Sequence, residues 1–257
     1  MADLYLELRD GDDGAVSTPA ALTEAETLNL LETAEFTASQ LVPWGSNYTF
    51  AVALETDDGC RQLAIYKPRS GEAPLYDFPD GTLYLRERAA YVFSRELGWE
   101  FVPPTVVRHG PHGIGSVQLY VQPKSAAEQD RKFWGGASLE IERFVLFDHL
   151  TNNADRKIGH LIRDRTGKAW GIDHGLTFNQ YPKLRTVLWQ FVGEPISPDL
   201  MDDLRAVQRN ASRVERALAP YLDQHEIAQA MQRVDRFLER GSYPSLNPRR
   251  NVPYGWW

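Results

Sequence analysis

Two aspartates that flank a short predicted hairpin carry the clearest capacity for chemistry in this sequence. Asp155 follows a helix predicted over 139–151, and Asp173 follows strands predicted near 160–163 and 168–172. Two carboxylates separated by a hairpin could face one cleft. There, one could orient or deprotonate an attacking hydroxyl and the other could hold magnesium against phosphates.

A lysine and a glutamate upstream could complete such a site. Lys67 ends a predicted third strand, and Glu87 lies in a helix predicted over 83–97. A strand-end lysine is usually solvated, but a lysine at this position can instead point into a cleft and grip ATP phosphates when a helical acidic residue pairs with it. Glu87 can equally be a surface charge among neighbouring arginines.

A turn of small residues is a third candidate. Ser46 and Asn47 follow Gly45 between strands predicted at 36–42 and 48–55. Small residues let backbone N–H groups approach phosphate oxygens without side-chain obstruction, although most turns of this composition are only turns.

The elements that must position these residues change character along the chain. Thr23 and Glu26 form the capping-box pair of a first helix. A third strand at 62–67 completes a predicted antiparallel meander. Further strands are predicted near 105–108 and 115–121, and further helices near 199–217 and 223–239. A β-rich first half and a mostly helical second half predict an α+β fold of two lobes.

We place the lobe boundary after the fifth strand. Residues 1–122 form the predicted β-rich N-terminal lobe, which includes helix 83–97. Residues 123–257 form the predicted, mainly helical C-terminal lobe, which carries both aspartate loops.

The two loops carry a family resemblance. Asn153-Ala154-Asp155-Arg156 followed by Gly171-Ile172-Asp173-His174-Gly175 resembles the catalytic and metal-binding loops of phosphatidylinositol 3-/4-kinases and their bacterial relatives. Residues 87–91, 97–98 and 102–105 are similar to the helix and following strand of the type II phosphatidylinositol 4-kinase group. The whole chain resembles a mainly actinobacterial family of uncharacterised proteins with the Asn-Ala-Asp-Arg-Lys and Ile-Asp-His-Gly motifs.

The resemblance implies a two-lobed, protein-kinase-like fold that binds ATP with Mg²⁺ or Mn²⁺. It implies that Asp155 is the catalytic aspartate, that Asp173 is a metal ligand and that Lys67 contacts the α/β phosphates while pairing with Glu87. It further implies that Ser46 and Asn47 lie in the phosphate-covering turn. Gln122 would lie at the hinge near adenine. The implied activity is transfer of the γ-phosphoryl group to a hydroxyl of a protein, lipid or small molecule.

One position departs from the pattern. His160 stands five residues after Asp155, where these kinases usually place an asparagine that binds the second metal. Imidazole suits transition metals better than magnesium. A Mn²⁺-preferring enzyme, a one-metal enzyme and a catalytically impaired, nucleotide-binding pseudokinase that acts as a scaffold are all compatible with it. A metal-dependent phosphoesterase built on His149, His160 and His174 is a weaker alternative, because the spacing matches no such signature.

Bulk properties restrict the partners. The net charge of −7 argues against a general nucleic-acid binder, and the single cysteine, Cys60, fits a reducing compartment. No signal peptide or membrane span is expected, so we expect a cytoplasmic protein. The C-terminal aromatic residues Trp256 and Trp257 either fold back and seal an apolar groove or engage a protein partner or a membrane interface.

Overall fold

The computed structural model describes residues 22–43, 45–124 and 131–254. The chain divides into two compact units. The first consists of residues 1–74 and 104–120, and the second of residues 75–103 and 121–257. The predicted α+β class, with a sheet-rich part and a mainly helical part, is confirmed.

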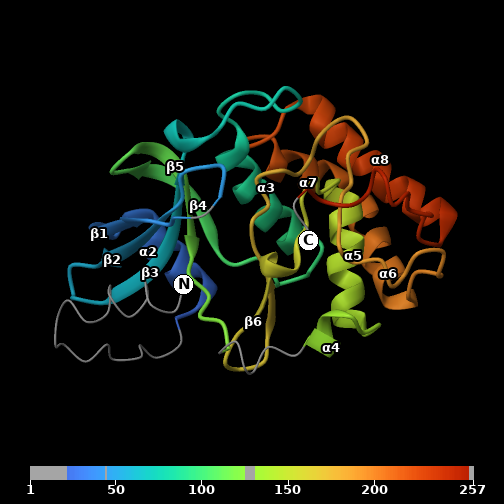
Figure 1. Ribbon diagram of the computed structural model, residues 1–257, viewed down its shortest axis with the longest axis horizontal. Helices are drawn as coiled ribbons and strands as arrows, with labels where there is room; N and C mark the ends of the chain where they lie inside the picture. Colours follow the sequence, from blue (N-terminus) through green and yellow to red (C-terminus); the bar gives the residue numbers. More distant parts are fainter. Residues whose placement is uncertain (1–21, 44, 125–130, 255–257) are drawn as a thin grey trace. The chain divides into compact units, whose positions relative to one another are not determined.

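The first unit is built on one antiparallel sheet of five strands in the order β1-β2-β3-β5-β4 (Figure 1). Its elements are α2 (Glu24–Thr33), β1 (Glu35–Leu41), β2 (Phe50–Glu55), β3 (Arg61–Pro68), the 3-10 turn η1 (Arg69–Gly71), β4 (Thr105–Gly110) and β5 (Gly113–Leu119). These elements confirm the predicted meander and the two later strands. The prediction succeeded because short β-rich runs alternate with glycine-containing turns in this part of the sequence.

The two faces of this sheet differ in composition. One face packs its apolar side chains with Leu30 and Leu31 of α2, and Val52, Tyr66 and Val117 are buried there. Lys67 lies directly opposite Ser116 of β5, one residue out of step with this core. Because directly opposed residues share a face, Lys67 belongs to the other face of the sheet.

The second unit is mainly helical. Its elements are α3 (Leu83–Glu96), α4 (Arg131–Trp134), α5 (Leu139–Thr151), the 3-10 turn η3 (Ile158–His160), β6 (Leu161–Arg163), β7 (Ala169–Gly171), α6 (Pro198–Arg209), α7 (Ala211–Leu218) and α8 (Gln224–Arg240). The grouping places α3 with these helices, whereas the predicted boundary after residue 122 assigned it to the N-terminal lobe. The division into functional lobes at residues 1–122 and 123–257 stays a prediction.

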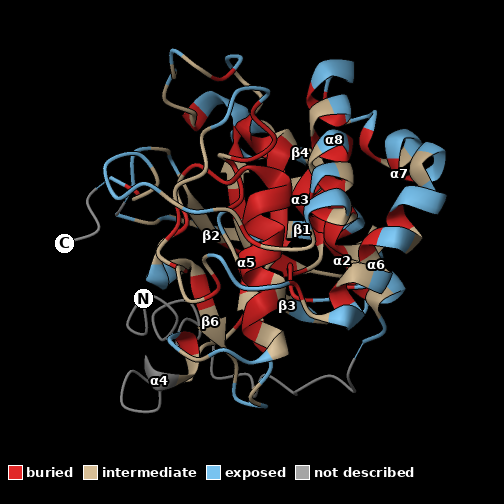
Figure 2. Cartoon of the chain, turned by 90° about the vertical axis from the view of Figure 1, so that its right-hand side faces the viewer, coloured by how far each residue is buried: buried red, intermediate tan, exposed pale blue. Residues whose placement is uncertain are grey.

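Helix α5 is the centre of the second unit. Its residues from Phe144 to Thr151 are all buried, so the helix is red almost throughout in Figure 2. A helix that is covered on every side can bring buried polar side chains into the middle of a domain. Ser138 caps its N-terminus by accepting a hydrogen bond from the Ile141 backbone N–H.

The helix predicted over 199–217 is wrong as a single element. It is interrupted at Asn210, which separates α6 from α7. The Asn210 side chain donates to the carbonyl oxygen of Ala206 at 2.8 Å. A local side-chain bond of this kind competes with the helical backbone, and this explains the break. Among the residues described, no helix is long and apolar enough to cross a membrane.

Candidate phosphoryl-transfer site

The loop that carries Asp155 begins where α5 ends. Asn152 closes the helix in the left-handed conformation, with φ of 52°. Its carboxamide nitrogen donates to the carbonyl oxygens of Asn179 and Tyr181 at 2.9 and 2.7 Å. Asparagine tolerates this conformation better than most residues, so the sequence fixes both the end of α5 and the direction of the loop.

A fully buried ion pair holds this loop against α5. The Arg156 guanidinium contacts the Asp148 carboxylate, with Nε at 3.0 and 3.1 Å from the two oxygens, and both side chains are 0% exposed. Asn153 and Thr186 donate to the same carboxylate at 2.9 and 3.2 Å. Burying two charges is favourable only when their hydrogen-bonding capacity is satisfied in this way.

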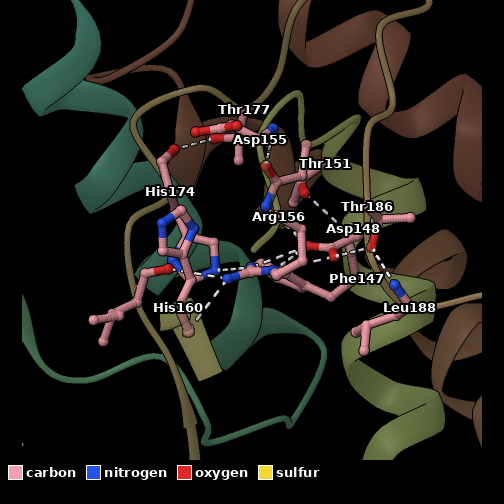
Figure 3. A network of polar contacts seen from close by, with 12 residues as sticks. Phe147, Asp148, Thr151, Asp155, Arg156, His160, His174, Thr177, Thr186 and Leu188 are labelled. Atoms are coloured by element: carbon pink, nitrogen blue, oxygen red, sulfur yellow. Dashed lines mark hydrogen bonds and ion pairs between the residues drawn. The ribbon is translucent and has the colours of Figure 1, made fainter. Parts of the chain in front are cut away.

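Arg156 also holds the loop that carries Asp173. Its Nη1 donates to the carbonyl oxygen of Ile172 at 3.0 Å, and its Nη2 lies 2.7 Å from Nε2 of His174. Figure 3 shows the guanidinium between Asp148 on one side and the histidines on the other. Arg156, which directly follows Asp155, therefore binds Ile172 and His174, the two neighbours of Asp173. These contacts bring the two predicted aspartates into one site.

Glu87 supports the second loop from α3. It is 2% exposed, and its Oε2 accepts a hydrogen bond from the His174 backbone N–H at 3.0 Å. Glu87 is therefore a buried group that positions the residue next to Asp173 rather than a surface charge. Its pairing with Lys67 stays a prediction.

The pKa of Asp155 is raised above the usual value of a carboxyl group. Partial burial is the main cause, and the negative charge of Asp173 adds to it. Lys157, whose Nζ lies 2.8 Å from Oδ2 of Asp155, and Arg185 act in the opposite direction. A carboxylate with a raised proton affinity is better suited to accept a proton from a hydroxyl.

His160 and Asp173 are in contact. The Nε2 atom of His160 lies 3.2 Å from Oδ2 of Asp173, and the aspartate side chain is 48% exposed. Asp173 has φ of 60°, in the left-handed region that non-glycine residues seldom adopt. Aspartate and asparagine tolerate this region better than most other residues.

Asp155 and Asp173 carry oxygen donors of the kind that a hard divalent cation prefers. In the described part of the chain, no three His, Cys, Asp or Glu side chains are grouped so as to hold a metal ion by themselves. Mg²⁺ is usually bound through one or two carboxylates, with substrate phosphates and water completing the shell. Asp173 with Asp155 is a donor set of that size, and His160 beside Asp173 adds a nitrogen donor that suits Mn²⁺ better than Mg²⁺.

His149 is not part of this site. It is buried on α5 and packs against Phe237 and Tyr243, with ring centroids at 5.5 and 5.8 Å. Burial lowers the pKa of His149 to about 4. His149 is therefore a packed residue near the end of α5, and the three-histidine phosphoesterase site receives no support.

The remaining predicted ligands belong to other parts of the chain. Lys67 is half-buried near the end of β3. Ser46 is exposed, whereas Asn47 accepts a hydrogen bond from the Ala73 backbone N–H at 2.7 Å and so holds its turn to the segment after η1. Gln122 lies two residues after the chain passes from the first unit to the second. Their contacts with a nucleotide stay predictions.

Sequence reasoning missed the residues that hold the loops together. Asp148, Arg156 and His174 are completely buried, and Thr186 lies 30 residues beyond Arg156 in the chain. The Asn-x-Asp-Arg motif named Arg156 without revealing its role. A charged residue next to a catalytic candidate gives no signal in hydrophobic periodicity, so its burial could not be anticipated.

The fold is shared with known kinases, although no family model matches the sequence. The structure of Golgi casein kinase with Mn and ADP bound superposes with a TM-score of 0.53 at 13% identity, over 88% of this chain and 80% of that one. The structure of hydra Fam20 with sugar gives a TM-score of 0.54 at 14% identity, over 86% and 90% of the two chains. These similarities establish a kinase-like fold.

One full-length sequence relative defines the family. Protein Rv2133c of Mycobacterium tuberculosis is 35% identical over 261 aligned positions, which cover 88% of this chain and 93% of the relative. An alignment of this extent covers both units and both aspartate loops rather than a single motif. The chain belongs to the family of Mycobacterium tuberculosis protein Rv2133c.

Proposed function

We propose that this protein transfers the γ-phosphoryl group of ATP to a hydroxyl group. One observation carries the proposal: Arg156 binds both neighbours of Asp173 and directly follows Asp155, so two carboxylates with different environments share one site. Phosphoryl transfer needs mainly positioning and charge neutralisation, which a rigid buried network supplies.

Asp155 is the proposed base. The acceptor oxygen forms a bond to the γ-phosphorus while the bond from that phosphorus to the β–γ bridging oxygen breaks. ADP leaves, and the acceptor proton passes to the Asp155 carboxylate. The raised pKa of Asp155 favours this step, because the carboxylate binds a proton more strongly than an exposed one does.

Asp173 and His160 are the proposed residues at the divalent cation. Bound Mg²⁺ or Mn²⁺ would neutralise charge on the nucleotide phosphates. Glu87 and Arg156 keep Asp173 in place through His174 and Ile172. Mn and ADP are the pair named for the Golgi casein kinase structure, and we propose the same pair as a test ligand here.

The nucleotide contacts in the first unit are carried over from the sequence motifs. Lys67 is proposed to bind the α/β phosphates, and Ser46 and Asn47 to lie in the turn that covers them. Gln122 is proposed to lie near the adenine base. The Ala73 backbone N–H donates to the carboxamide oxygen of Asn47, so the carboxamide NH2 group of Asn47 and the backbone N–H groups of the turn are the proposed phosphate donors.

Ligand-dependent melting tests nucleotide binding. Mn²⁺–ATP and Mg²⁺–ATP should raise the melting temperature, because a ligand that binds the folded state stabilises it by mass action. Asp173→Asn should remove the metal-dependent part of the shift. Asp202→Asn, at a side chain that is 75% exposed, is the matched control and should retain it. No shift with any nucleotide and metal would overturn the proposal.

A transfer assay tests the reaction itself. Radiolabelled ATP should be offered to a phosphatidylinositol lipid, a serine-containing peptide and a small alcohol, since the phosphatidylinositol kinase resemblance places lipids among the candidate acceptors. Asp155→Ala should lower transfer by at least about 100-fold while ATP binding persists. Transfer at the wild-type rate by this variant would rule out Asp155 as the base.

The contact between His160 and Asp173 favours a second candidate, a nucleotide-binding pseudokinase. An imidazole beside the proposed metal-binding carboxylate can compete with the cation for that oxygen. Under this candidate, the wild-type protein binds Mn²⁺–ATP but labels no acceptor. A large gain of transfer in His160→Asn would show that the histidine impairs the site. Unchanged transfer by an active wild-type protein would show that it does not.

A further inference from the structure

Arg185 lies beside the Asp155 loop because its backbone is paired with that loop. The Arg185 N–H donates to the carbonyl oxygen of Asn153 at 2.8 Å, and the Arg185 carbonyl accepts from the Arg156 N–H at 3.0 Å. The two segments also form a parallel bridge between Arg156 and Thr186. The Arg185 side chain therefore starts from a backbone position that is fixed relative to Asp155.

The C-terminal segment holds the outer side of the same strand-like stretch. The Asn251 side chain donates to the carbonyl oxygen of Leu184 at 2.7 Å, and the Thr186 N–H donates to the Asn251 carbonyl at 3.0 Å. Three residues later, the ring of Tyr254 lies against the Arg185 guanidinium, 4.6 Å from its central carbon. The Tyr254 hydroxyl is 3.5 Å from Nη2 of Arg185.

The Arg185 guanidinium has no carboxylate partner among residues 22–43, 45–124 and 131–254. Asp155 is instead paired with Lys157, at 2.8 Å. Stacking on an aromatic ring orients a guanidinium without neutralising its charge. In a chain with a net charge of −7, an oriented guanidinium that forms no direct ion pair within these described residues lies near the proposed base, close enough for its charge to lower the pKa of Asp155.

We propose that Arg185 is an oxyanion-binding residue, held by Tyr254, for a phosphate-type group that is brought to Asp155. The planar guanidinium matches the geometry of phosphate and can bind two of its oxygens at once. The group has two possible sources, which are the γ-phosphate of ATP and an anionic group on the acceptor. The assignment of these two sources rests on the proposed phosphoryl-transfer function. The binding of an oxyanion by Arg185 can be measured without any transfer.

The test measures binding by titration calorimetry and by melting, with inorganic phosphate, Mn²⁺–ADP and Mn²⁺–ATP as separate probes. Arg185→Gln removes the charge, and Arg250→Gln, at an exposed position in the C-terminal segment that carries Tyr254, is the control. Tyr254→Ala removes the stacked ring, whereas Tyr254→Phe keeps the ring and removes the hydroxyl. None of these side chains lies in the buried core, so the folded protein should be retained.

The expected result is binding that Arg185→Gln weakens by about tenfold or more, because the substitution removes the charge-assisted hydrogen bonds to the oxyanion. Loss confined to Mn²⁺–ATP, with Mn²⁺–ADP unchanged, would identify the γ-phosphate as the source. Loss of inorganic phosphate binding with both nucleotides unchanged would identify the acceptor. Tyr254→Ala should weaken the same probe, and Tyr254→Phe should restore most of the binding.

Two results would overturn the inference. Equal binding of all three probes by the wild type and Arg185→Gln would show that Arg185 binds no oxyanion. Equal loss in Arg185→Gln and Arg250→Gln would reduce its role to general charge attraction. Phosphate binding that depends on Arg185, in a protein that binds no ATP, would sustain this inference while the proposed function fails.

Discussion

Asp155 illustrates at the scale of one residue how a candidate catalytic group can lower stability. Its pKa is raised by burial and by the nearby charge of Asp173, so the folded protein holds a proton on this carboxyl group more strongly than the unfolded chain does. Between the ordinary and the raised pKa, the free energy of unfolding therefore falls as pH rises. Above the raised pKa the full penalty is present.

Asp155→Asn should remove that penalty and raise the melting temperature at pH 7. The gain should disappear below the ordinary pKa of an aspartate, because the carboxyl group is then protonated in both states. Melting curves from pH 3 to pH 8 would measure it, with the exposed Asp202→Asn as the reference. A variant that melts below the wild type at pH 7 would show that the ion pair with Lys157 outweighs burial.

At the scale of elements, Arg156 joins the end of α5 to the two aspartate loops. Arg156→Leu leaves the Asp148 carboxylate buried without its partner and should lower the free energy of unfolding by about 3–5 kcal/mol. Adding Asp148→Asn should recover part of the loss, because no uncompensated charge then remains. Urea denaturation of the single and double variants would measure both values. A double variant less stable than the single one would contradict this account.

Two capping boxes offer a second comparison between elements. Glu226 caps α8 together with Asp223, and it also pairs with the buried Arg86 of α3. Glu26 forms the same motif with Thr23 on α2, where it is exposed. Glutamine can fill the same position of a capping box, so the substitution removes the charge and keeps the cap.

Glu226→Gln should therefore lower the free energy of unfolding by about 1.5–3 kcal/mol, the contribution of a hydrogen bond to a charged group. Glu26→Gln should change it much less, because the exposed side chain remains solvated in both states. Chemical denaturation of both variants would give the difference. Equal effects would mean that Arg86 draws its stability from the carbonyl of Thr177 and the ring of Phe78 instead.

Most elements of the fold could be predicted from the sequence, whereas the buried polar contacts could not. Helix α5 was predicted with the bounds that it has, and the strands of the sheet were found from their β-rich runs and turns. Asp155 and Asp173 were predicted to share a site, which the Arg156 contacts support. The position of Arg156 could not be predicted, because burial of a charge depends on partners distant in the chain. The break at Asn210 depends on one side-chain bond and leaves no periodic signal.

At the scale of the whole molecule, the fold alone does not decide the reaction. The kinase-like structures share 13–14% identity with this chain, so they preserve an arrangement of elements rather than a set of side chains. The same fold can host different functions. The acceptor must therefore be argued from groups such as Arg185, whose surroundings belong to this chain.

The stability of the whole molecule should also respond to acid through His149. Its pKa is lowered to about 4 by burial, whereas an unfolded histidine has a pKa near 6.5. Between these values the unfolded chain binds a proton that the folded protein excludes, so the free energy of unfolding falls as pH decreases. The total loss attributable to this one group is about 3 kcal/mol.

His149→Leu should flatten that part of the pH dependence, because leucine keeps an apolar side chain against Phe237 and Tyr243 without a titrating group. His225→Leu, at an exposed position near the start of α8, is the matched control and should leave the slope unchanged. Denaturation at pH 4, 5, 6 and 7 would give the slope for each protein. Since the raised pKa values of Asp148 and Asp155 act in the opposite direction, the difference between His149→Leu and the wild type is the decisive quantity. Parallel slopes for these two proteins would mean that His149 can be protonated inside the fold, and that α5 is more open at this helix end than its packing indicates.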